Sequence, residues 1–225
     1  MGIISKEKIS LKSTIGQSLA HILRGRLLNN QYEQGAKMIE EEIAGEFAVS
    51  RASVRDALAI LETEGLIVRE INKCKTVRKF TRKDIEDLLC ARSAIETAAA
   101  LECIKNKLPE AELIKKIESM ERASSLASAE DDYDLTASDF GFHEIIISAS
   151  ENRYFIEFWE DIRNQLLMLM NKAFQLDATE FVAGIEGHAY YVKLLKEGDP
   201  AKLSEYIHMI CYSVKDPLLN SIDEP

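Results

Sequence analysis

The stretch SRASVRDALAILETEGL, residues 50–66, decides how the rest of this chain is interpreted. Ser50 is a residue type that favours the N-cap of a helix. Val54, Leu58 and Leu61 then recur at the spacing of one helical face. The stretch therefore predicts an amphipathic helix with one buried side.

Two arginines of this helix lie away from its apolar face. Arg51 and Arg55 are one turn apart and close to the helix N-terminus. A recognition helix places there the side chains that reach base edges and phosphates in the major groove of DNA. We therefore expect these guanidinium groups to face DNA.

The flanking residues predict the rest of a small domain. Residues 38–47 have the apolar spacing of a shorter helix, and residues 48–50 are a tight turn. After the arginine-bearing helix, residues 66–71 and 75–80 are rich in β-forming residues and are separated by a short polar connection. Helix, turn, helix and hairpin together predict a winged helix-turn-helix.

The same residues resemble a known family. The run AGEFAVSRASVRDAL (44–58) followed by LETEGLI (61–67) resembles the signature of the GntR family of bacterial transcription regulators, and it spans two helices and the start of the wing. The resemblance implies DNA contacts from Ser50, Arg51, Ser53 and Arg55 of the helix and from Asn72 and Lys73 of the wing. Cys74 departs from the family pattern, which usually has a small glycine there, so the resemblance supports the wing contacts less strongly.

Charge is distributed unevenly along the 225 residues. The formal net charge of the whole chain is −10, which by itself argues against nucleic acid. Residues 1–80, however, hold 13 lysines and arginines against 10 acidic residues, a net charge of +3, whereas residues 81–225 hold 15 against 28, a net charge of −13. The positive part coincides with the recognition helix, and the acidic remainder keeps the body of the protein away from DNA.

Cysteine usage and hydropathy indicate a cytoplasmic protein. The four cysteines, Cys74, Cys90, Cys103 and Cys211, include no C-x-x-C pair, so the sequence predicts neither a zinc knuckle nor a disulfide framework. The short, charged start is unlike a secretory leader, and no apolar run approaches about 18 residues, so we expect no membrane span.

The chain is predicted to be mostly α, with two domains divided near residue 80. Residues 1–80 form the winged helix-turn-helix domain, whose first helix starts at Ser13 or Thr14 and ends near residue 29. Residues 81–225 form an all-helical bundle that begins with a capped restart at Thr81. Its further helices are expected at 109–120, 134–149, 152–176, 178–197 and 200–214.

The second domain also resembles part of a family. The motifs RSAIE (92–96), DFGFH (139–143), ASEN (149–152), EGH (186–188) and GD (198–199) occur in the order seen in the FadR subfamily. Each motif is short, and their order and spacing together make the resemblance. It implies an all-helical domain that binds an effector and contributes to dimerisation.

Asp139 and His143 are candidates for metal ligands. They are four residues apart, so both side chains project from adjacent turns of one helix and can bind one ion. Imidazole with carboxylate suits zinc, nickel or manganese. A satisfied surface or core pair has the same spacing and remains the alternative. The resemblance implies a divalent ion held by one aspartate and three histidines, of which the first three ligands would be Asp139, His143 and His188.

The fourth ligand does not fit the family spacing. That spacing places it at Ile210, whereas the nearby histidine is His208. Two residues along a helix rotate a side chain by about 200°, which points His208 away. Three alternatives remain: the last helix is two residues shorter near Pro200 and His208 completes the site, fewer protein ligands hold the metal, or no metal binds.

Arg92 has two interpretations. A guanidinium inside a helical bundle is costly without an anion, so Arg92 could clamp the carboxylate of an effector. Alternatively, it pairs with one of the many acidic residues, such as Glu96 one turn away.

The leading functional hypothesis is a transcription regulator, most often a repressor in this family, that binds double-stranded operator DNA as a homodimer. A small carboxylic-acid effector in the helical domain would shift operator affinity. One alternative is a metal-dependent helical enzyme with an accessory winged helix, although no general base or nucleophile motif accompanies the metal candidates. Another is a winged helix used only for protein contacts, with Arg51 and Arg55 in surface ion pairs.

Overall fold

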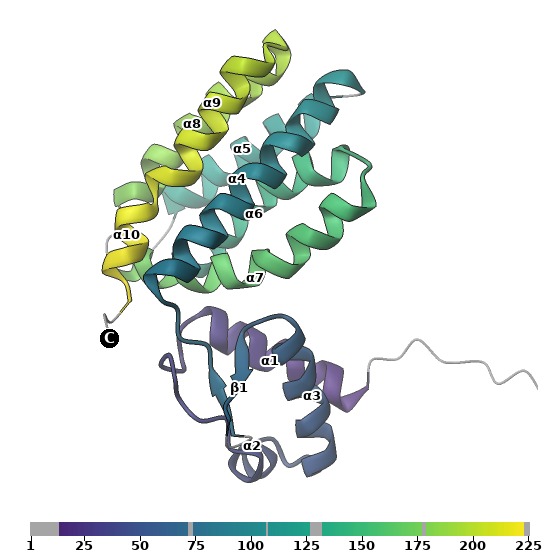
Figure 1. The fold of residues 1–225 in the computed structure, drawn as a ribbon, viewed down its shortest axis with the longest axis vertical. Coiled ribbons are helices and arrows are strands. Elements are labelled where there is room, and N and C mark those ends of the chain that lie inside the picture. The colour runs from purple at the N-terminus through teal and green to yellow at the C-terminus, as the bar shows by residue number, and fades with distance from the viewer. Residues whose placement is uncertain (1–13, 72–73, 107, 127–131, 177–178, 223–225) are drawn as a thin grey trace, which may run out of the picture.

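The computed structural model describes residues 14–71, 74–106, 108–126, 132–176 and 179–222, without the side chains of 124–126, 132–135, 176 and 179–185. Figure 1 shows a small unit of three helices and a hairpin below a larger bundle of helices. The predicted fold class, mostly α with a winged helix-turn-helix and a helical bundle, is confirmed.

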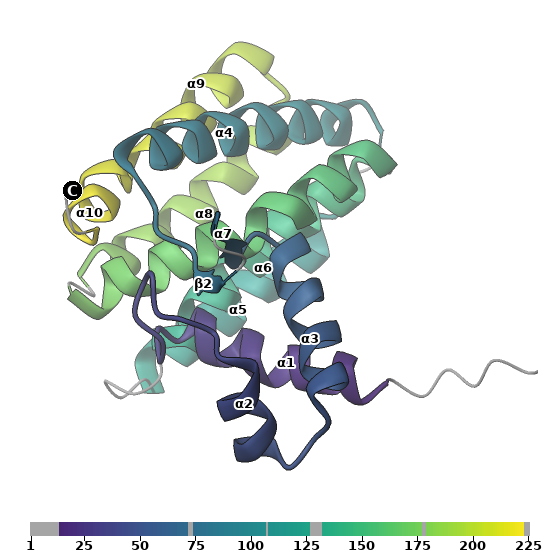
Figure 2. The ribbon, with the colours of Figure 1, turned by 60° about the horizontal axis from the view of Figure 1, so that its bottom comes forward.

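The small unit contains α1 (Ile15–Leu28), α2 (Glu40–Phe47), α3 (Arg51–Thr63), β1 (Ile67–Arg69) and β2 (Lys75–Val77). The predicted apolar face of α3 is buried: Val54, Leu58 and Leu61 are all 0% exposed. They pack mainly against α1, which begins at Thr14 with a reciprocal capping box. Figure 2 shows α1 and α3 crossing in front of the bundle.

Two boundaries in the small unit differ from the prediction. The second helix begins at Glu40, two residues later than expected, because the backbone of Met38 donates to Lys75 O at 2.9 Å and thereby extends the hairpin. The antiparallel strands pair over only three positions, Ile67–Val77 to Arg69–Lys75. After β2 the chain leaves the sheet so that Phe80 enters the core at 4% exposure.

The bundle begins with α4 at the predicted restart, where Thr81 and Asp84 form a capping box. Its helices are α4 (Arg82–Lys105), α5 (Glu110–Leu126), α6 (Asp132–Ala149), α7 (Arg153–Leu176), α8 (Thr179–Glu197), α9 (Pro200–Ser213) and α10 (Lys215–Asn220). Helix α10 was not predicted from the sequence. This helix has six residues, too few for an apolar period, and only Leu218 among them is buried.

Helix α7 lies on the side of the bundle that faces the small unit (Figure 1). All five residues from Leu166 to Met170 are at most 3% exposed, although they point in different directions around the helix. A helix that is apolar on every side must be covered on every side. The bundle covers one side of α7, and the small unit, through α1, covers another.

The contact between the end of α3 and α7 leads to one testable prediction, at Gly65. Its φ is +70°, and a Cβ added there would lie 2.6 Å from the side-chain nitrogen of Gln165 on α7. Gly65→Ala should therefore lower the free energy of unfolding by about 1–2 kcal/mol, measured by urea denaturation. Gly25→Ala in α1 is the matched control, because its Cβ meets nothing within 4 Å, and it should be neutral or stabilising. Equal unfolding free energies for the two variants would contradict this account.

Candidate DNA-binding surface and buried polar cluster

The N-terminus of α3 is exposed at the end of the small unit away from the bundle (Figure 1). Ser50 caps the helix as predicted: its side chain accepts a hydrogen bond from Ser53 N at 3.1 Å. Arg51 projects from the first turn and Arg55 from the second, and both are exposed. The opposite end of α3 faces α7, so the bundle does not cover these residues.

Arg55 makes one internal ion pair. Its Nε donates to Glu40 Oε2 at 2.8 Å, and the side chain is still 62% exposed. An exposed pair of this kind is worth less than about 1 kcal/mol. A guanine edge or a phosphate could therefore displace Glu40 from Arg55.

The hairpin places two further basic residues near Arg51 and Arg55 that were not predicted from the sequence. Arg69 and Lys75 are directly paired across β1 and β2, and with Arg51 and Arg55 they line one hollow of about 670 Å³. The sequence signal that could have found them is their place in the two predicted strands of the hairpin. The predicted wing contacts Asn72 and Lys73 lie outside the described residues, and Cys74 beside them is partly buried.

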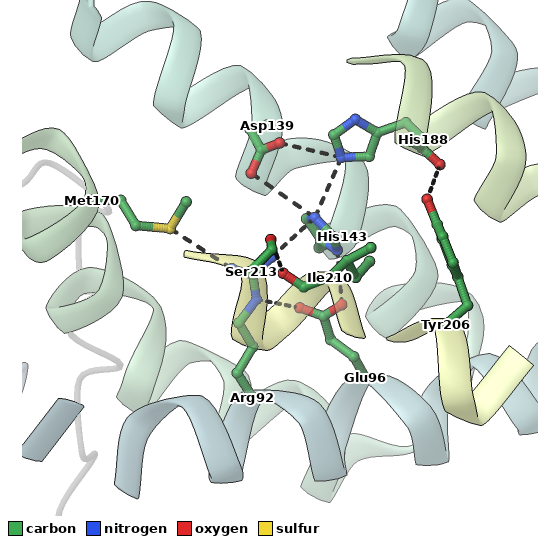
Figure 3. Close-up of polar contacts among 10 residues, drawn as sticks. Arg92, Glu96, Asp139, His143, Met170, His188, Tyr206, Ile210 and Ser213 are labelled. Atoms are coloured by element: carbon green, nitrogen blue, oxygen red, sulfur yellow. Dashed lines mark hydrogen bonds and ion pairs between the residues drawn. The ribbon is translucent and has the colours of Figure 1, made fainter. Parts of the chain in front are cut away.

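A cluster of five charged or ionisable side chains lies inside the bundle (Figure 3). Arg92 and Glu96 come from α4, Asp139 and His143 from α6, and His188 from α8. Each side chain is at most 12% exposed. We call this set the buried polar cluster. Burying so many charged groups requires that they satisfy one another.

The three predicted metal-ligand candidates Asp139, His143 and His188 meet within this cluster. His143 Nε2 and His188 Nε2 are 3.4 Å apart, and His188 Nε2 is 3.2 Å from Asp139 Oδ1. Two nitrogens that each bind a tetrahedral zinc ion at about 2.1 Å would be about 3.4 Å apart. The donor atoms of the three residues lie within 4.8 Å of one another. Their type and spacing therefore fit a divalent ion.

Glu96 sets the orientation of His143. His143 Nδ1 lies 2.8 Å from Glu96 Oε2 and acts as the donor, because the carboxyl group is ionised. Burial alone would raise the pKa of Glu96, but His143 and Arg92 outweigh it and lower this pKa to about 2. With its proton on Nδ1, His143 leaves Nε2, the ring nitrogen nearest Asp139 and His188, unprotonated and able to act as a ligand atom. This role of Glu96 was not predicted from the sequence.

Arg92 joins the cluster to its surroundings. Its Nε donates to Glu96 Oε1 at 2.7 Å, its Nη2 donates to His143 Nε2 at 3.1 Å, and its Nη1 lies 3.7 Å from Met170 Sδ. Burial alone would lower the pKa of Arg92, but the neighbouring acidic groups, Glu96 foremost, together outweigh burial and raise this pKa above its usual value. The guanidinium therefore stays charged. The ion pair with Glu96, one of the two interpretations of Arg92, is thus present.

The expectation that His208 is a fourth ligand is wrong in this structure. His208 is exposed, its Nδ1 is 3.4 Å from Ser93 Oγ, and its ring lies 4.4 Å from that of Tyr212. Helix α9 runs without interruption from Pro200 to Ser213, so the two-residue offset is not absorbed. Ile210, drawn beside the cluster in Figure 3, occupies the position that the family spacing assigns to the ligand.

Comparisons with known proteins agree with both parts of the molecule. Residues 87–210 match the FCD domain, and residues 15–75 match the bacterial regulatory proteins of the gntR family. The chain belongs to the gntR-family regulators that carry an FCD domain. The FCD match includes Arg92, Glu96 and all three metal-ligand candidates, and the gntR match includes all of α1, α2 and α3.

Two relatives of this gntR-family chain are named as transcriptional repressors, and each aligns with this chain over most of its own length. A gluconate operon transcriptional repressor of Bacillus subtilis is 29% identical over 210 residues, which are 91% of this chain and 85% of the relative. A probable D-xylose utilization operon transcriptional repressor of Paenarthrobacter nicotinovorans is 25% identical over 87% of this chain and 84% of its own.

Solved structures show the same fold. Escherichia coli McbR/YncC superposes with a TM-score of 0.76 at 18% identity, covering 93% of this chain and 99% of its own. A putative gntR regulator from Rhodococcus sp. RHA1 gives a TM-score of 0.75 at 18% identity, covering 94% of this chain and 100% of its own.

This gntR-family chain is therefore a ligand-responsive, DNA-binding transcription regulator. The enzyme alternative finds no support, because the family and its relatives are regulators. Within the described residues, no helix is both long enough and apolar enough to cross a membrane.

Proposed function

We propose that this regulator represses transcription from the bacterial cytoplasm by binding operator DNA as a homodimer. The exposed guanidiniums of Arg51 and Arg55 at the start of α3 carry this proposal. We assign the DNA contacts to Ser50, Arg51, Ser53, Arg55, Asn72 and Lys73. Three relatives are named as operon repressors, which supports repression over activation. Residues 1–80 form the DNA-binding domain, and residues 81–225 bind the effector and dimerise.

The proposed effector is a small carboxylic acid that binds at the buried polar cluster. Arg92 is its clamp, because a guanidinium forms charge-assisted, bidentate hydrogen bonds with a carboxylate. Two of the relatives are named for a gluconate operon. D-gluconate, which is a carboxylate, is therefore the first acid to test.

A divalent ion, zinc, nickel or manganese, is the proposed cofactor. Asp139, His143 and His188 would hold it, and Glu96 would orient His143. When bound, the ion supplies a positive charge that attracts an acidic effector. Three protein ligands leave coordination positions available for the acid and water.

Native mass spectrometry with elemental analysis of the purified full chain tests these proposals together. We expect twice the subunit mass of 25.4 kDa and about one divalent ion per subunit. Addition of D-gluconate should add the mass of the acid to the wild type but not to Arg92→Met. A monomer contradicts the dimer proposal, a metal-free protein contradicts the cofactor proposal, and equal binding of the acid by both proteins contradicts the clamp.

DNA binding should also depend steeply on salt. Contacts with phosphates release counterions, so affinity for duplex DNA should fall by at least about tenfold between 50 and 200 mM KCl. Titrations of a fluorescent duplex followed by anisotropy measure this. A winged helix that contacts only proteins would bind no duplex at either salt concentration.

A further inference from the structure

Helix α7 touches the end of α1 through one buried side chain. Asn171 is 1% exposed, and its Nδ2 donates to the backbone oxygen of Leu28 at 2.8 Å. Leu28 is the last residue of α1, where backbone carbonyls have no partner within the helix. Asn171, which belongs to the helical bundle, therefore caps the C-terminal end of α1.

A second contact lies on the same face of α7. Asn164 precedes Asn171 by seven residues, about two helical turns, so the two amides point in nearly the same direction. Asn164 Nδ2 donates to Glu64 Oε2 at 3.3 Å. Glu64 ends α3, and it also accepts from Arg24 Nε of α1 at 2.7 Å. Helix α7 thus contacts the C-terminal ends of two helices of the DNA-binding unit, α1 and α3.

A neighbouring side of α7, about 100° around the helix from Asn171, touches the buried polar cluster. Met170, directly before Asn171, receives the contact from Arg92 Nη1 (Figure 3). The guanidinium of Arg92 also lies 5.3 Å from the ring centroid of Phe140, and that ring is 5.8 Å from Trp159 of α7. Arg92 therefore reaches α7 directly and through one aromatic ring.

A ligand at the cluster must disturb these contacts. His143 Nε2 has one lone pair, which now accepts from Arg92 Nη2 at 3.1 Å. Any group that takes this lone pair, or that binds the guanidinium itself, has to shift Arg92. Because the guanidinium is a rigid plane, a shift of Nη2 also changes the position of Nη1 relative to Met170.

We propose that α7 couples the buried polar cluster to the DNA-binding unit, and that Asn171 is the positioning residue that transmits the change to α1. This inference rests on the proposed function, in which a ligand at the cluster alters operator binding. The competing route is covalent: α4 carries Arg92 and Glu96, and it follows the hairpin directly at Thr81. The experiment separates the two routes.

The test uses hydrogen exchange in the full chain and needs neither effector nor operator. Arg92→Met/Glu96→Gln perturbs the cluster while removing one charge of each sign, so that neither remains buried without its partner. The readout is the exchange of the backbone amides of residues 29–31, which bond to the last turn of α1. The double variant is measured in the wild-type, Asn171→Leu and Asn164→Leu backgrounds. Gln175→Leu, at an exposed position of α7, is the matched control.

In the wild-type and Gln175→Leu backgrounds, the cluster variant should change exchange by about fivefold or more, the lower end of coupling between sites. In the Asn171→Leu background the change should fall below about twofold, and Asn164→Leu should reduce it as well. An undiminished change in both asparagine variants would assign the coupling to α4 and overturn the proposal. No change in the wild type would overturn it too. Should Asn171→Leu fail to fold by circular dichroism, Asn164→Leu decides.

Failure here is distinguishable from failure of the proposed function. A protein that binds DNA and an acid but shows no exchange coupling through Asn171 would remain a regulator with another route. A protein that shows the coupling but binds no duplex would retain the α7 connection and lose the proposed function.

Discussion

A His188→Gln variant is expected to bind Zn²⁺ at least about 100-fold more weakly than the wild type. His188 Nε2 is one of three donor atoms that converge in the buried polar cluster, and a missing ligand should cost no less than the loss of an outer partner, which costs about 10- to 100-fold. Competition with a chromophoric chelator measures the affinity. His208→Gln is the matched control, because this histidine is exposed and contacts Ser93 instead.

Glu96→Gln should weaken Zn²⁺ binding by about 10- to 100-fold without removing a ligand. The amide cannot supply the negative charge that holds the Nδ1 proton of His143 and directs Nε2 inward. If His188→Gln and His208→Gln weaken binding equally, the three-residue site is wrong.

Arg51→Ala and Arg55→Ala should each weaken specific operator binding by about 1–3 kcal/mol, or about 5- to 150-fold. This magnitude applies if each guanidinium makes a bidentate contact with a base. Arg55 first has to leave Glu40, but that exposed pair is weak, so its loss offsets little of the DNA contact. Fluorescence anisotropy with a selected operator duplex measures both variants against the wild type.

Arg153→Ala is the control for the two recognition-helix variants. It removes an arginine of the same charge from an exposed position on α7. Its operator affinity should stay within about twofold of the wild type, since the net charge changes by the same amount in all three variants but Arg153 is not on the recognition helix. If Arg51→Ala and Arg55→Ala bind the operator as tightly as Arg153→Ala, α3 is not the recognition helix.

The small unit could be predicted closely because the residues that determine its helices are close to one another in the sequence. The spacing of Val54, Leu58 and Leu61 fixes which face of α3 is buried, and the cap at Ser50 fixes where the helix starts. The lengths of the strands were harder to predict, since their pairing depends on the hydrogen bond of Met38 to β2 and on the burial of Phe80 in the core. Local periodicity does not contain such contacts.

The buried polar cluster was only partly predictable. Asp139 and His143 share a helix, so their proximity followed from spacing, and His188 came from the family resemblance alone. The roles of Glu96 and Met170 depend on how α4, α6 and α7 are set against one another, which no single-helix pattern specifies. The same holds for Asn171, whose partner Leu28 is 143 positions away in sequence.

Selection of bound duplexes from a random DNA library, followed by sequencing, tests the central claim most directly. A homodimer that reads DNA with two copies of α3 should enrich a twofold-symmetric sequence whose half-sites are separated by about 10 base pairs or a multiple of it. The same selection with an Arg51→Ala/Arg55→Ala protein should lose that pattern. A wild-type pool without any enriched symmetric sequence would contradict the account.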